Sequence, residues 1–119
     1  MATFLIHIHT GHADPNKATL GLLVALAAKD EGHDVTVFLA GDGVHLLAPA
    51  NRDLEGEGTG VIGAHLDRHA EAGTPFLVSG KSAKARGYDD ALLDGLNASF
   101  AMPDRLVQAA AAADTVLCY

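Results

Sequence analysis

The chain has 119 residues, of which 49% are hydrophobic, and a formal net charge of −7. This length suits one domain with a substantial core. The negative charge argues against nucleic acid or an acidic membrane surface as a partner, because both bind basic proteins. No apolar run is long enough to span a bilayer, and the residues after Met1 read as a strand rather than a secretion signal, so we expect a cytoplasmic protein.

The first third of the chain has the pattern of a strand, a helix and a second strand. Apolar side chains alternate with others across Thr3–His9, which predicts a strand. An aspartate followed by proline predicts a helix from Pro15 to about Glu31, and its wide apolar belt indicates burial on more than one side. The nearly continuous apolar run Val35–Ala40 predicts a central strand.

The middle of the chain is less regular. Val44–Ala48 fits a single helical turn before Pro49, and the acidic, glycine-rich stretch Asn51–Gly60 is typical of a mobile surface loop. Val61–Ala72 has the spacing of a helix and should end at Gly73.

The stretch Pro75–Gly87 organises the rest. Phe76–Val78 has the pattern of a buried parallel strand, and the turn after it opens directly into a helix that should end at Gly87. Ligands of open α/β sheets bind at the edge where strands pass into helices. We therefore expect Ser79, at this edge, to lie at the mouth of a cleft.

The remaining elements continue the alternation. A short helix (Asp89–Gly95), a short strand (Asn97–Phe100), a helix (Asp104–Ala113) and a final strand (Thr115–Cys118) are predicted. Strands that alternate with helices indicate an α/β fold, with a mostly parallel sheet and helices on both faces. No linker or repeat divides the chain, so residues 1–119 should form a single domain.

The turn after Phe76–Val78 could bind a small anion. Gly80, Lys81 and Ser82 match the end of a phosphate-binding loop, but Pro75 stands where the complete motif needs glycine. A helix start with a lysine nearby can still hold a small anion, and simple helix capping is the alternative.

Ser79 could also be a nucleophile if His9 or His12 reached it. No acidic partner is placed by the spacing, and the glycine positions of the G-x-S-x-G motif hold Leu77 and Lys81. The motif for a serine hydrolase is therefore absent.

Two groups of histidines could bind metal. His7, His9 and His12 could converge on zinc, nickel or copper, and hydrogen bonding in an interface or under a helix is the alternative. His65 and His69 share a helix face, although the zinc-protease motif needs Glu where Leu66 stands, so two ordinary surface histidines are the favoured interpretation.

Cys118 is the only cysteine, which excludes an intrachain disulfide and zinc sites built from several cysteines. It lies on a strand that we expect to be buried, where a cysteine usually acts as a small core residue rather than a nucleophile.

The order of these motifs resembles the DsrE/DsrF-like family of sulfur-relay proteins. The resemblance rests on six segments spread over almost the whole chain: Thr10-Gly11 with Asp14-Pro15, Gly32-His33-Asp34-Val35, Gly43-Val44, Val78-Ser79-Gly80, Ala85-Arg86-Gly87 and Leu93-Asp94-Gly95. It implies a YchN-like fold, a three-layer α/β/α domain with a mostly parallel five-stranded sheet. It also implies trimers or hexamers, and partners within a sulfur relay.

The resemblance further implies persulfide transfer by a cysteine at the end of the strand before the A-x-A-R-G-like helix. Ser79 occupies that position here. A hydroxyl cannot carry a sulfane sulfur, because that chemistry needs a thiolate that forms a sulfur–sulfur bond.

The sequence therefore favours a non-catalytic member that binds a small anion or a partner. Its expected ligand-binding residues are His9, Thr10, His12, Ser79, Gly80, Lys81, Ser82 and Arg86. A metal-binding protein that uses His7, His9 and His12 is the alternative, and a sulfurtransferase that acts through Cys118 is the second alternative. No cofactor is expected apart from a divalent metal under the first alternative.

Overall fold

Five parallel strands form the central sheet of the computed structural model, which describes all residues 1–119, and their order is β6-β5-β2-β1-β7. The strands are β1 (Thr3–Ile8), β2 (Asp34–Leu39), β5 (Phe76–Ser79), β6 (Ala98–Ala101) and β7 (Thr115–Cys118). The apolar strand β2 lies at the centre, as its composition predicted. The edge strands β6 and β7 are the two that come last in the chain.

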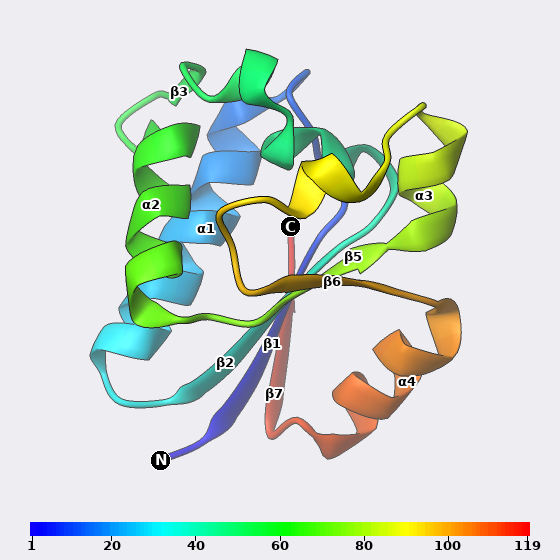
Figure 1. The fold of residues 1–119 in the computed structure, drawn as a ribbon. Coiled ribbons are helices and arrows are strands. Elements are labelled where there is room, and N and C mark those ends of the chain that lie inside the picture. Colours follow the sequence, from blue (N-terminus) through cyan, green and yellow to red (C-terminus); the bar gives the residue numbers. More distant parts are fainter.

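Helices cover both faces of this sheet, which confirms the three-layer α/β/α prediction (Figure 1). The α-helices are α1 (Pro15–Asp30), α2 (Ile62–Ala72), α3 (Gly80–Ala85) and α4 (Pro103–Ala112). The 3-10 helices are η1 (Gly41–Leu47), η2 (Pro49–Asn51) and η3 (Asp90–Leu93). None of these helices combines the length and the apolar composition that a membrane crossing requires.

The stretch Asn51–Gly60 is not the loose surface loop that its composition predicted. It contains strand β3 (Glu55–Gly56), which pairs antiparallel with β4 (Gly60–Val61), and this small hairpin packs against α1. Gly56 is buried there, and only glycine fits, because a Cβ atom would collide with the hydroxyls of Thr19 and Thr59. Those two hydroxyls lie 2.7 Å apart and hydrogen-bond.

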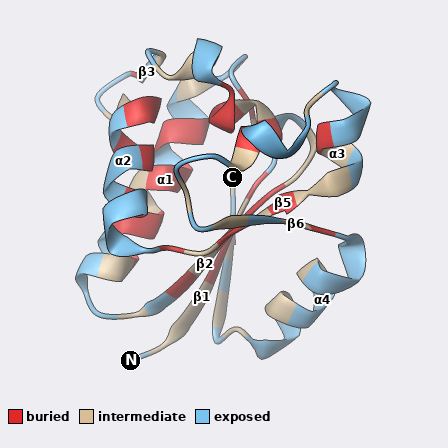
Figure 2. Ribbon diagram, viewed as in Figure 1, coloured by how far each residue is buried: buried red, intermediate tan, exposed pale blue.

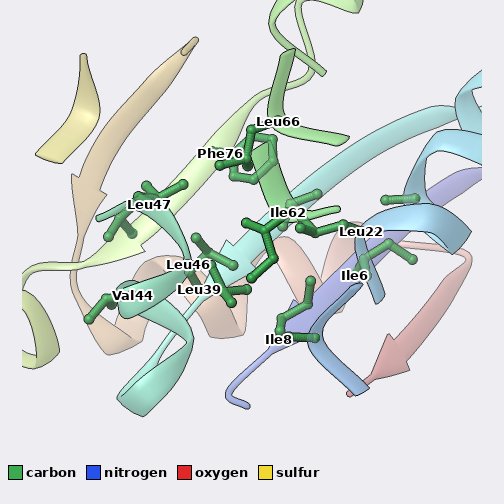
Figure 3. Close-up of a cluster of buried hydrophobic side chains, with 14 of the residues drawn as sticks. Ile6, Ile8, Leu22, Leu39, Val44, Leu46, Leu47, Ile62, Leu66 and Phe76 are labelled. Carbon is green, nitrogen blue, oxygen red and sulfur yellow. The ribbon is translucent and has the colours of Figure 1, made fainter. Parts of the chain in front are cut away.

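One face of the sheet carries most of the hydrophobic core. A cluster of 19 buried residues lies between this face and α1, α2 and η1. Figure 3 shows part of it, with Leu22, Ile62 and Phe76 among the labelled side chains. The strands contribute every second residue to it, as pleated backbone requires. We call this side of the sheet the covered face.

The opposite face is covered by α4 alone, and we call it the open face. Its core cluster has three buried residues, Leu5, Phe38 and Ala101. Helix α4 itself contains no buried residue, and Figure 2 shows it in the colours of exposed and intermediate residues.

His65 and His69 are buried, which corrects the interpretation of a surface helix with two ordinary histidines. The His65 Nε2 atom lies 2.6 Å from the Thr59 carbonyl oxygen. His69 is fully buried, with Nε2 3.0 Å from the Leu22 carbonyl oxygen and Nδ1 2.9 Å from the Thr74 hydroxyl. The helix face was predicted correctly, but it points into the covered core, where the two rings join α2 to α1 and to the β3–β4 hairpin.

Candidate functional site

The candidate site lies at the edge where β1, β2 and β5 end. Parallel strands place their carboxyl ends at one edge of a sheet, so the segments that follow them meet there. These segments are residues 9–14 after β1, η1 after β2 and α3 after β5. The predicted ligand-binding residues belong to these segments, to the ends of their strands or, for Arg86, to the C-cap of α3.

Ser79 acts as the N-cap of α3. Its Oγ atom accepts the backbone N–H of Ser82 at 3.1 Å, as the capping interpretation predicted. The Ser82 hydroxyl in turn accepts the N–H of Gly41 at 2.8 Å and thereby joins α3 to the end of β2. Ser79 is half-buried, and the alternation of β5 puts its side chain on the open face.

Arg86 fastens α3 to η1. Its Nε and Nη2 atoms donate to Asp42 Oδ1 at 3.2 and 3.0 Å, and Nη1 donates to the Ser82 carbonyl oxygen at 3.1 Å. The structure therefore brings three predicted site residues together, Ser79, Ser82 and Arg86, and adds Asp42, which the sequence did not single out.

A second group at this edge contains His12, Asp42, His45 and Tyr88. The His45 Nδ1 atom lies 2.6 Å from the Tyr88 hydroxyl, and its Nε2 lies 3.9 Å from Asp42 Oδ1. The His12 ring packs edge-on against His45, with the ring centroids 4.6 Å apart. Burial, followed by the charge of neighbouring His12, lowers the pKa of His45. The imidazole is therefore favoured in its neutral form, which can accept or donate a hydrogen bond at Tyr88.

This group forms because of a close approach that only glycine permits. A Cβ atom at Gly11 would overlap the carbonyl oxygen of Asp42, so the loop after β1 lies directly on η1 and carries His12 to His45. Sequence reasoning missed His45 and Tyr88. The signal that could have found His45 is its spacing of three residues from Asp42, just after the central strand.

The cleft that we expected above Ser79 is not formed within one chain. The three surface pockets have volumes of about 80, 140 and 300 Å³, and Ser79, Gly80 and Lys81 line none of them. The Lys81 side chain is exposed and makes no hydrogen bond or ion pair within the chain. Thr10 is half-buried and its hydroxyl makes no hydrogen bond within the chain.

The three histidines near the start of the chain do not gather at one point. The His7 ring lies edge-on to His9 and to Phe38, at centroid distances of 5.5 and 5.7 Å. His12 turns instead toward His45. The structure contains no group of three or more His, Cys, Asp or Glu side chains that could hold a metal ion.

Cys118 is exposed, which corrects the expectation of a buried core residue. It lies on β7, an edge strand, and its side chain belongs to the open face, beyond the cluster that α4 covers. In the parallel register of β1 and β7 it stands next to His7.

Comparison with known proteins agrees with this architecture. A model of the DsrE/DsrF-like family matches residues 2–119, and no curated protein matches the chain. The crystal structure of the ychN protein from E. coli is similar to this chain, with a TM-score of 0.84 and 20% sequence identity over 100% of both chains. At this identity the likeness establishes the fold, and the family match covers almost the whole chain. The chain therefore belongs to the DsrE/DsrF-like family.

Proposed function

We propose that this chain is a binding member of its family and does not carry sulfur at the end of β5. The observation that carries the proposal is the hydrogen bond from the Ser82 N–H to Ser79 Oγ at 3.1 Å. The hydroxyl stands where the family resemblance implies a reactive cysteine, and it serves as a helix cap. It cannot form the sulfur–sulfur bond of a persulfide.

A small anion is the ligand class that the side chains of this edge favour. The chain has only eight lysines and arginines against 15 acidic residues, yet Lys81, Lys84 and Arg86 fall within α3 and its C-cap. Asp42 neutralises part of this charge through Arg86. Lys81 has no partner within the chain, and the exposed His12 lies on the neighbouring loop. The edge therefore retains cationic donors in an otherwise acidic protein.

Titration with inorganic phosphate, followed by the backbone and histidine signals in NMR spectra, tests this function. We expect saturable shifts confined to α3, Arg86 and His12. Lys81→Ala should weaken binding about tenfold, the value of one charge-assisted hydrogen bond, without disturbing any internal contact. Lys17→Ala is the matched control because Lys17 is an exposed lysine on α1. Equal binding by the two variants, or no saturable shift, would contradict the proposal.

We extend the proposal to assembly in the cytoplasm as a homo-oligomer, a trimer or hexamer, that meets partners of a sulfur relay. Two observations support a further contact surface: α4 contains no buried residue, and it exposes 66% of Val107. Light scattering over a range of concentrations should give three or six times the mass of one chain, whereas a monomer at all concentrations would contradict the assembly.

A further inference from the structure

A surface pocket of about 140 Å³ lies on the open face, between α4 and the amino-terminal halves of β1 and β2. One face of α4 forms a wall of this pocket with Arg105, Gln108, Ala109 and Ala112. These four residues are three or four positions apart, which places their side chains next to one another on a helix. The pocket is therefore built from one helix face and the strands beneath it.

The floor of the pocket is apolar and has room for a small organic group. Leu5 of β1 and Thr36 of β2 are register partners on the open face, and Leu5 is 1% exposed. Opposite them, Ala109 and Ala112 carry only a methyl group each, and their small size leaves the space unfilled. An apolar cavity of about 150 Å³ can hold benzene. A pocket of this volume therefore accommodates an apolar body about as large as one six-membered ring.

Arg105 is the one arginine of the chain without a carboxylate partner. Arg52, Arg68 and Arg86 each pair with an aspartate, at distances of 2.7, 3.3 and 3.0 Å. The Arg105 side chain makes no hydrogen bond or ion pair, although the chain has 15 acidic residues. Asp114, just after α4, instead accepts a backbone N–H of β1 at 2.8 Å. The pocket thus has a free guanidinium beside an apolar floor.

From this combination we infer that the pocket binds a small organic acid, with its carboxylate on Arg105 and its apolar body beside Leu5 and Ala112. A guanidinium matches a carboxylate because it can offer two parallel N–H donors. Thr36 and Gln108 also line the pocket, and their side chains have no hydrogen-bond partner within the chain, so they are available as further donors. An organic cation would meet the charge of Arg105, and inorganic phosphate would leave the apolar floor unused.

This pocket is separate from the edge at Ser79. Thr36 lies in the amino-terminal half of β2, whereas the candidate site begins beyond the carboxyl end of that strand, at Gly41. No residue of the pocket belongs to the loop after β1, to η1 or to α3. The inference therefore goes beyond the proposed function, and failure of phosphate binding at α3 and failure of acid binding under α4 are independent results.

Titration with benzoate, followed by the backbone amide signals in NMR spectra, tests the inference. We expect saturable shifts at Thr36, Ala109 and Ala112, and excess inorganic phosphate should leave them unchanged. Arg105→Gln should weaken benzoate binding at least about tenfold, because a charge-assisted hydrogen bond is lost. Arg68→Gln is the matched control, since Arg68 is an arginine that pairs with Asp30 and does not line the pocket.

Two further arms separate the charge of the ligand from its shape. Benzamide has the shape of benzoate without its charge, and it should bind at least about tenfold more weakly. Ala112→Leu should abolish binding of benzoate because the larger side chain fills the pocket, while leucine at this exposed position of α4 preserves the helix.

Three results would overturn the inference. The first is equal affinity of Arg105→Gln and Arg68→Gln for benzoate, and the second is equal affinity of the wild type for benzoate and benzamide. The third is the absence of a saturable shift at the pocket, including shifts confined to α3. A peptide that ends in phenylalanine serves as a competitor, and tighter binding of this peptide than of benzoate would overturn the assignment to a free acid.

Discussion

The two faces of the sheet differ in what covers them. The covered face packs a cluster of 19 buried residues against α1, α2 and η1, whereas the open face has a cluster of three under α4. Both faces are built from the same strands and alternate residue by residue. The difference is therefore set by the helices, and it separates the residues that hold the fold from those that remain available for binding and chemistry.

The histidines illustrate the same division. On the covered side, both ring nitrogens of His69 have partners, the Leu22 carbonyl oxygen and the Thr74 hydroxyl. On the open side, His7 keeps Nε2 without one. A histidine alone therefore does not indicate a site, because its ring can be fully hydrogen-bonded in the core, as in His69, or buried without a partner, as in His7.

The largest expected effect comes from placing a thiol at the end of β5. The Cys118→Ser variant has no cysteine and should gain no sulfur from polysulfide. When Ser79→Cys is added to it, the intact mass should increase by one sulfur atom per chain. The reason is that the Ser82 N–H, which now bonds Ser79 Oγ, can stabilise a thiolate at that position. Absence of a gain in the folded double variant would mean that Ser79 does not occupy the family's sulfur position.

Truncation of a large buried residue on the covered face should cost much more stability than truncation of a side chain on α4. Phe76 is fully buried on the covered face and contacts the His69 ring, so Phe76→Ala should lower the free energy of unfolding by about 4 kcal/mol. Val107→Ala on α4 should change it by less than about 0.5 kcal/mol. Urea unfolding curves measure both, and equal losses would contradict the division between the faces.

Low pH should lower the stability of the fold through His69, which is buried on the covered face. Burial lowers the pKa of His69 to about 4, whereas in the unfolded chain it is near 6.5. The unfolded state therefore takes up a proton first as the pH falls, so the stability contribution is complete above pH 6.5 and is lost as the pH approaches 4. The loss amounts to roughly 3 kcal/mol. In His69→Gln, the free energy of unfolding should fall less between pH 6.5 and 4 than in the wild type. An equal fall in both proteins would contradict this role of His69.

A smaller loss of stability is expected when the cap at Ser79 is removed. Ser79→Ala removes the acceptor of the Ser82 N–H and should cost about 1 kcal/mol, whereas Ser79→Asp keeps an acceptor and should cost less. Thermal or urea unfolding can resolve the pair. Identical stabilities for Ser79→Ala and the wild type would show that the hydroxyl does not act as a cap.

Most of the fold could be predicted because its signals are local. Gly32, Gly73 and Gly87 were expected to end helices, and each adopts a positive φ, at 86°, 67° and 82°. The apolar run of β2 indicated a central strand, and the strand order confirms it. Helix ends and strand burial depend on neighbours in the chain, so they can be read from the sequence.

The misses arose where distant segments decide the structure. Gly56 and Thr59 have the composition of a loop, and only α1, which lies far away in the chain, makes them a packed hairpin. The exposure of Cys118 depends on how far α4 extends across the open face, and this cannot be predicted from the residues of β7 alone. The contact of His45 with Tyr88 joins residues 43 positions apart.

Native-state hydrogen exchange tests the division between the two faces most directly. We predict that backbone amides of α1 and α2 exchange only through global unfolding, while those of α4 exchange through local opening at rates several orders of magnitude faster. Such a result would show that the covered face carries the stability and that the open face can move and bind. Equal protection of α4 and α1 would contradict the account.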